Sequence, residues 1–206
     1  ILNGRGKILN TIVGEERPVP FGADYLKSSD GCLSEALQLK GLNTILELKE
    51  IAVRHGATQF SGIATEVFRK AVNGDSYLNR IRALDIPVRV LTQDMEAELG
   101  YTSVVSGYDE SDLCVWDSGG ASFQISTRRN LQDSPSHTFD TYMGSLGSSV
   151  SAALLVREVL HKSLQETPTP NPVSMEQCQS LIDILVQKLA PVPSWLKDKD
   201  HIVAVS

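Results

Sequence analysis

Residues 113–127 read LCVWDSGGASFQIST, in which two apolar runs flank a glycine-rich turn. The runs Leu113–Trp116 and Phe123–Thr127 have the apolar and β-branched composition of strands, so the pattern predicts two strands joined through Asp117–Ser122. Adjacent glycines are a common choice for a β-hairpin turn, which is one interpretation. The alternative is an anion site, because consecutive backbone N–H groups of such a turn form a nest and Ser122 adds a donor.

Asp117 bears on the choice between these interpretations. A carboxylate repels phosphate, but Mg²⁺ often bridges a carboxylate and phosphate oxygens. Asp117 therefore fits an anion site only if a divalent cation accompanies the anion.

Hydrophobic periodicity outside this stretch predicts alternating helices and strands. The expected helices are Ser34–His55, Glu66–Val72, Asp75–Leu84 capped by Asp75, Gln93–Tyr101, one from Gly144 to about Leu160, and one that Ser174 caps with Gln177. The other expected strands are Ile8–Val13, Gln59–Ala64, Pro87–Thr92, His137–Met143 and His201–Val205. The elements alternate in two blocks, so we predict an α/β protein of two lobes, residues 1–100 and 101–206.

The composition excludes several classes of protein. The 206 residues carry a net charge of −6, which argues against a nucleic acid duplex as partner. The cysteines are three and far apart (Cys32, Cys114 and Cys178), so we expect no disulfide framework or zinc site and a reducing compartment. No apolar run approaches the ~20 residues of a membrane span, and no signal segment opens the chain. We therefore expect a cytoplasmic protein.

Two charged residues outside the turn are candidates for chemistry. Glu96 lies on the opening turn of the helix that follows the strand Pro87–Thr92, where a glutamate also simply complements the helix dipole. Arg69 lies on the short helix after Thr65, where a solvated arginine or an ion-pair partner is the plainer interpretation.

Read together, four segments resemble one family in order and spacing, from about Gly14 to Leu160. Residues 64–73, ATEVFRKAVN, resemble the Ala-Thr-x-x-x-Arg-x-Ala-x-Asn stretch of the exopolyphosphatase / guanosine pentaphosphate phosphohydrolase (Ppx/GppA) family. Residues 90–99, VLTQDMEAEL, resemble its Gly-x-Glu-Glu-Ala-Arg-Leu region, and residues 115–124, VWDSGGASFQ, resemble its Asp-Ile-Gly-Gly-Gly-Ser-Thr-Glu loop. Met143-Gly144 matches the family's Leu/Met-Gly before a helix.

The resemblance implies an actin/sugar-kinase-like fold of two ribonuclease-H-like lobes with the active site between them. Family members use Mg²⁺ to remove the terminal phosphoryl group from inorganic polyphosphate or guanosine pentaphosphate, and these are the expected partners, with a homodimer as a further option. The implied roles are water activation by Glu96, the metal side at Asp117 and Gln124, and substrate binding by Arg69, Gly119, Gly120, Ser122 and Gly144.

The chain also departs from the family pattern. Gln124 stands where the loop has its last Glu, Met95 replaces the first of the paired glutamates, and Glu98 replaces the Arg that follows. The family's opening Asp-x-Gly-Ser-Asn-Ser loop and closing Gly-Gly-Thr loop have no counterpart, so we expect a chain clipped at both ends.

These departures keep two alternatives open. One is a diverged, non-catalytic regulatory protein that binds polyphosphate or an alarmone. The other is a sugar or acetate kinase relative, which shares the fold but needs a nucleotide loop that we do not find in the sequence.

Overall fold

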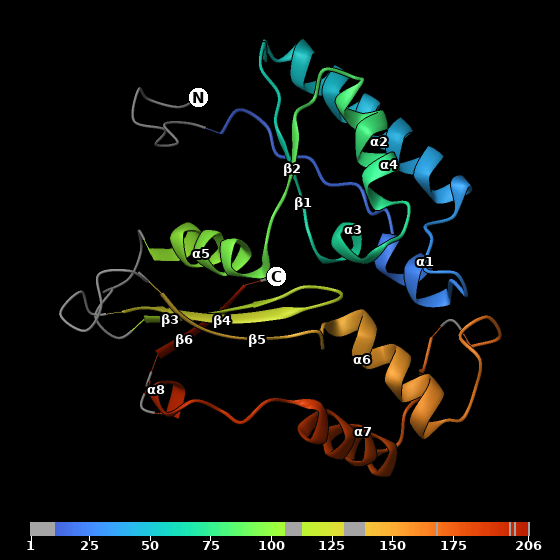
Figure 1. Ribbon diagram of the computed structural model, residues 1–206, viewed down its shortest axis with the longest axis vertical. Helices are drawn as coiled ribbons and strands as arrows, with labels where there is room; N and C mark the ends of the chain where they lie inside the picture. The colour runs from blue at the N-terminus through green and yellow to red at the C-terminus, as the bar shows by residue number, and fades with distance from the viewer. Residues whose placement is uncertain are drawn as a thin grey trace. The chain divides into compact units, whose positions relative to one another are not determined.

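The computed structural model describes residues 11–105, 113–129, 139–167, 169–197, 199 and 201–205 (Figure 1). The chain forms two compact units: unit 1 contains Ile1–Ala64 and Lys70–Arg89, and unit 2 contains Thr65–Arg69 and Val90–Ser206. The chain thus passes between units before residue 90, whereas the sequence places a lobe boundary at residue 100. The correspondence of these units to the two expected lobes stays a prediction.

Unit 1 is built around the long helix α2. Its elements are α1 (Phe21–Lys27), α2 (Glu35–Arg54), β1 (Gly62–Ala64), α4 (Gly74–Arg82) and most of β2 (Val88–Val90), which pairs with β1. The predicted start of α2 is confirmed, because the Ser34 side chain accepts a hydrogen bond from the Leu37 N–H. Gly56, just past its end, has φ of +85°, the left-handed conformation typical of a helix terminus.

Helix α2 packs against α4 and α1 at a glycine. A Cβ atom on Gly41 would lie 2.2 Å from the Tyr77 hydroxyl and 2.5 Å from the Phe21 ring, so only glycine permits this approach. The rings of Phe21 and Tyr77 lie 5.2 Å apart, and burial raises the pKa of Tyr77 to about 12. Helices α1, α2 and α4 therefore meet at this glycine.

Two predictions in unit 1 are wrong. Helix α4 begins at Gly74 with Asn73 as its N-cap residue, instead of being capped by Asp75. The Asn73 side chain instead binds the backbone of Leu33, accepting from its N–H at 2.8 Å and donating to its carbonyl at 2.8 Å. Residues 11–13 form no strand, and the first three residues of the expected strand Ile8–Val13 lie outside the described part of the chain.

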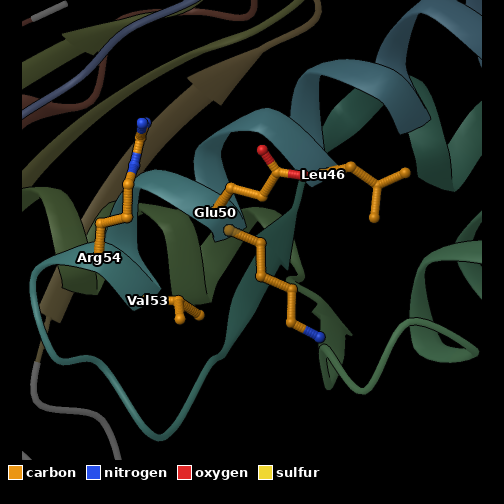
Figure 2. A pocket seen from close by; sticks show the side chains of 5 residues that line it. Leu46, Glu50, Val53 and Arg54 are labelled. Atoms are coloured by element: carbon orange, nitrogen blue, oxygen red, sulfur yellow. The ribbon is translucent and has the colours of Figure 1, made fainter.

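An open pocket of about 370 Å³ lies along the C-terminal half of α2 (Figure 2). Leu46 and Val53 give it apolar walls, and Glu50 and Arg54 stand beside them. Lys49 also lines it, with its ammonium group 5.0 Å from the centre of the Phe60 ring. None of the site residues predicted from the sequence lines this pocket.

Unit 2 is a four-stranded sheet with helices on both faces. The strand order is β5 (Phe139–Gly144), β4 (Phe123–Arg128), β3 (Leu113–Ser118) and β6 (His201–Val205). Strands β3, β4 and β5 pair antiparallel, and β6 pairs parallel to β3. Strand β3 runs two residues further than predicted, so Asp117 lies inside the strand, and His137 of the expected strand His137–Met143 lies outside the described residues.

Helix α5 (Gln93–Val104) covers one face of this sheet, as Figure 1 shows. Tyr101 of α5 packs on Leu113 and Val115 of β3, and its ring meets Phe139 edge-on at 5.2 Å. The predicted helix start is confirmed, because the Thr92 side chain caps α5 by accepting from the Met95 N–H at 3.3 Å. This packing fixes which α5 residues face β3 and β4.

Two predicted helices follow β5. The expected helix to about Leu160 is α6 (Ser148–Leu154) continued by the π-helical turn η2 (Leu155–Val159). Helix α7 (Met175–Lys188) begins with the predicted capping box of Ser174 and Gln177 and lies on the sheet face opposite α5 (Figure 1). The remaining helices are α3 (Glu66–Lys70), which ends two residues before the predicted Val72, and the short α8 (Ser194–Lys197), which was not predicted. Within the described residues, no helix has the length and apolarity needed to span a membrane.

Candidate active site

The glycine-rich turn is the connection of a β-hairpin. In the register of β3 and β4, Asp117 pairs with Gln124 and Ser118 with Phe123. The Gly119 N–H donates to the Ser122 carbonyl at 3.0 Å and closes the turn. The hairpin interpretation of residues 117–122 is therefore confirmed, and the anion-binding role assigned to Gly119, Gly120 and Ser122 stays a prediction.

The carbonyl groups of this turn are held by the start of α6. Gly147, Ser148 and Ser149 donate their N–H groups to the carbonyls of Ala121 at 3.2 Å, Gly119 at 3.0 Å and Gly120 at 2.8 Å, respectively. The first N–H groups of a helix lack partners within the helix, so the turn supplies acceptors that α6 requires. The orientation of three successive peptide groups is thereby fixed.

Gly147 is a residue that the sequence analysis missed. A Cβ atom there would lie 2.5 Å from the Gly119 carbonyl oxygen and 2.6 Å from the Ala121 nitrogen, a distance that real Cβ atoms do not reach. The available signal was the second glycine in residues 143–147, MGSLG, of which only Gly144 matches the family pattern.

Asp117 lies beneath α5. Successive side chains of a strand alternate between faces, and Val115, two residues earlier, packs on Tyr101 of α5. A Cβ atom on Gly100 would lie 3.4 Å from the Asp117 Oδ2 atom, so this helix position lies directly against the carboxyl group. Burial raises the pKa of the Asp117 carboxyl, because removal from water disfavours its charged form.

Glu96 lies one helical turn before Gly100, on the same side of α5. Its Oε2 atom accepts a hydrogen bond from Gln124 Nε2 at 2.9 Å, and its Oε1 atom accepts from Arg69 Nη1 at 2.6 Å. The Glu96 side chain is only 9% exposed. Its burial and its two partners exclude the interpretation that Glu96 merely complements the helix dipole from the surface.

Gln124 connects Glu96 to the hairpin. Besides its bond to Glu96, the Gln124 amide nitrogen lies 3.3 Å from the Ser122 hydroxyl oxygen, and both residues are buried. The structure therefore joins four residues in one hydrogen-bond network: Arg69, Glu96, Gln124 and Ser122. Asp117 is placed beside this network as the strand partner of Gln124.

Arg69 is held by three acceptors. Nη1 donates to Glu96 and to the Leu91 carbonyl, and Nη2 donates to Glu66 Oε2 at 2.7 Å. Burial by itself lowers the pKa of Arg69, but the hydrogen bonds and charges of Glu96 and Glu66 outweigh it and raise that pKa. Glu66 was missed from the sequence, although its position three residues before Arg69 on a helix was a usable signal.

Gly144 ends β5 opposite Phe123. A Cβ atom there would lie 2.7 Å from the Phe123 ring, and the Gly144 carbonyl lies 3.4 Å from Gln93 Nε2. The structure thus gives Gly144 a packing role, and its predicted role in substrate binding stays a prediction.

The oxygen atoms of Asp117 and Gln124 suit a hard cation. The half-buried carboxylate of Asp117 gains from a neighbouring positive charge. The Gln124 amide uses its nitrogen for Glu96 and Ser122, which leaves its oxygen as an acceptor. Among the described residues no group of three or more His, Cys, Asp or Glu side chains forms a protein-only metal cage. A site with two protein oxygen atoms is compatible with Mg²⁺, because this ion commonly retains several water ligands and also binds substrate phosphates.

Comparison with known proteins identifies the family. The model of the Ppx/GppA phosphatase family matches residues 2–187. This chain belongs to the Ppx/GppA phosphatase family. No curated protein sequence matches the chain significantly.

Solved structures of Ppx/GppA proteins share the fold of this family member. An exopolyphosphatase from Cytophaga hutchinsonii matches with a TM-score of 0.75 at 17% identity, over 96% of this chain and 59% of its own. An exopolyphosphatase-like protein matches with a TM-score of 0.71 at 16% identity, over 96% of this chain and 60% of its own. The Aquifex aeolicus Ppx/GppA family member matches with a TM-score of 0.60 at 22% identity, over 89% and 54%.

These matches confirm the predicted α/β class and the actin-like type of fold. The chain spans between 54% and 60% of the length of these relatives.

Proposed function

We propose that this protein hydrolyses the terminal phosphoryl group of inorganic polyphosphate or guanosine pentaphosphate, with Glu96 as the residue that activates water. Membership in the Ppx/GppA family supports phosphatase chemistry. The cytoplasm as location and a homodimer as assembly belong to the same proposal.

The observation that carries the proposal is the environment of Glu96. Arg69 and Gln124 each donate one hydrogen bond to a different oxygen of this carboxylate, so its orientation is fixed. Each oxygen of an ionised carboxylate has a second lone pair, so Glu96 retains the capacity to accept a proton from water. A fixed carboxylate beside a glycine turn and a serine hydroxyl is a suitable arrangement for a general base.

The reaction is a displacement at phosphorus. Water attacks the terminal phosphorus and transfers a proton to Glu96, while the bond from that phosphorus to the bridging oxygen breaks. The products are orthophosphate and a chain shorter by one phosphate. Phosphoryl transfer depends mainly on positioning and on stabilisation of the equatorial oxygens, which Arg69, the Ser122 hydroxyl and the backbone of Gly119 and Gly120 would provide.

Mg²⁺ belongs to this proposal. Asp117 and Gln124 are the residues that would hold it, and it would supply positive charge against the phosphate oxygens. The cation would also offset the repulsion between the Asp117 carboxylate and a bound phosphate.

The proposal is tested by measuring orthophosphate release from polyphosphate and, separately, from guanosine pentaphosphate. Glu96→Gln keeps the shape of the side chain but removes the base, so we expect release to fall by about 10²-fold or more. Glu98→Gln is the matched control, because Glu98 lies on the same helix and is exposed. Equal rates for wild type and Glu96→Gln would refute the role of Glu96.

A second candidate is a protein that binds phosphate chains without hydrolysing them. Gln124 in place of the family's Glu favours this candidate, since it removes one negative charge from the metal side. Calorimetric binding of polyphosphate by the wild type with no release of orthophosphate would establish it.

A further inference from the structure

Glu66 is a buried carboxylate of unit 2 that the proposed mechanism does not use. Its side chain is 8% exposed, and its Oε2 atom lies 2.7 Å from Arg69 Nη2. Its Oε1 atom accepts a hydrogen bond from the Ser145 hydroxyl at 3.2 Å. Ser145 directly follows β5, so Glu66 links α3 to the segment that leads into α6.

The charges around Arg69 do not favour an added anion. Arg69 contributes +1, and Glu66 and Glu96 contribute −1 each, so the three side chains sum to −1. A phosphoryl group that approaches Arg69 therefore competes with two carboxylates that already pair with it. Arginine binds carboxylate and phosphate through the same planar arrangement of donors, so the two groups are direct competitors.

Glu66 occupies one of the donors of Arg69, the residue to which the proposed function gives the phosphate oxygens. Arginine has five N–H donors. Nη1 donates to Glu96 and to the Leu91 carbonyl. The Nη2 and Nε edge of the guanidinium is therefore the edge that can bind an oxyanion. Glu66 accepts a hydrogen bond from Nη2 at this edge. The Arg69 side chain is 21% exposed, so this side chain is accessible to a ligand.

We propose that Glu66 competes with phosphoryl oxygens for Arg69 and thereby lowers the affinity of the site for phosphate groups. The inference rests on the proposed function, because it names a determinant of that same site. A phosphate group takes the place of Glu66 on Nη2, and Glu66 returns when the phosphate leaves. The competition weakens the binding of orthophosphate, so it favours release of the product.

The test is calorimetric binding of orthophosphate and of tripolyphosphate to the full chain. Glu66→Gln keeps the side-chain shape and removes the charge, so we expect both ligands to bind at least about tenfold more tightly. Glu35→Gln is the matched control, because Glu35 also pairs with an arginine, Arg80, at 2.9 Å but at an exposed site. We expect the control to bind within about twofold of the wild type.

Ser145→Ala provides a second variant if Glu66→Gln does not fold. It removes the hydroxyl that holds Glu66 Oε1, so it is expected to shift both affinities in the same direction, by about two- to threefold. Unchanged or weaker binding by folded Glu66→Gln, or by Ser145→Ala where it replaces that variant, overturns the inference while the proposed function stands. No binding of either ligand by wild type or variant overturns both.

Discussion

The Cα atom of Gly147 faces the carbonyl oxygen of Gly119 so closely that a Cβ atom at position 147 would lie 2.5 Å from that oxygen. Three hydrogen bonds from Gly147, Ser148 and Ser149 to the carbonyls of the glycine turn surround this contact. The start of α6 and the turn between β3 and β4 are therefore packed and hydrogen-bonded to each other. The geometry of the candidate phosphate loop depends on a residue outside the loop.

Gly147→Ala is expected to displace the turn. The added methyl group meets backbone atoms, which move less readily than the end of a side chain, so we expect a loss of about 1–3 kcal/mol in the free energy of unfolding. Urea denaturation measures this loss. Gly22→Ala is the control, because no atom lies within 4 Å of the position of its Cβ. A Gly147→Ala protein as stable as the control would contradict the contact.

Gln124→Glu tests the metal side of the site. In the wild type, Gln124 Nε2 donates a hydrogen bond to Glu96 Oε2 at 2.9 Å. The substitution removes this bond and places a second carboxylate next to that of Glu96. Without Mg²⁺ we expect a loss of about 1–3 kcal/mol in stability, since the bond is lost and like charges approach. Added Mg²⁺ is expected to raise the melting temperature of this variant more than that of the wild type.

Gln177→Glu is the control for this exchange of amide for carboxylate. Gln177 closes the capping box of α7, where Glu serves equally well, so its melting temperature should change little with or without Mg²⁺. An equal response of Gln124→Glu and wild type to Mg²⁺ would place the cation elsewhere.

Local signals in the sequence predicted the elements of the fold. The predicted capping box of Ser174 depends on residues three positions apart, and it is present. The helix expected from Ser34 is also present, and Ser34 is its N-cap residue. The hairpin of residues 113–127 follows from composition and adjacent glycines, again within one segment. The same reasoning failed at Asn73, because its amide binds Leu33, a residue 40 positions away.

The candidate site shows the same limit. The motifs brought Arg69, Glu96, Gln124 and Ser122 to attention, and the structure joins them by hydrogen bonds. Glu66 and Gly147 were missed because their significance comes from partners distant in sequence. Ser145, which binds Glu66, lies 79 residues from it. The turn that constrains Gly147 is separated from it by two strands, β4 and β5. A sequence motif identifies residues with catalytic potential. The residues that position them, or compete for their hydrogen bonds, are found only from the packing of the folded chain.

Asp117→Asn is expected to stabilise the protein at neutral pH. Burial raises the pKa of Asp117 in the folded state above its ordinary value of 3.8, so folding at neutral pH includes the cost of burying a charge. Below pH 3.8 the carboxyl is neutral in both states and this cost vanishes. The wild type therefore gains stability relative to Asp117→Asn as the pH falls through the folded pKa toward that value.

Melting temperatures of wild type and Asp117→Asn across this range measure the effect, and Asp183→Asn, at an exposed position on α7, controls for the loss of one negative charge. The advantage of Asp117→Asn should be largest at neutral pH and absent in acid. Mg²⁺ should reduce it at neutral pH, because a cation beside the carboxylate stabilises only the wild type. A variant less stable than the wild type at neutral pH without Mg²⁺ would show that the Asp117 charge is already compensated by the protein, and a cation would then have no vacant role there.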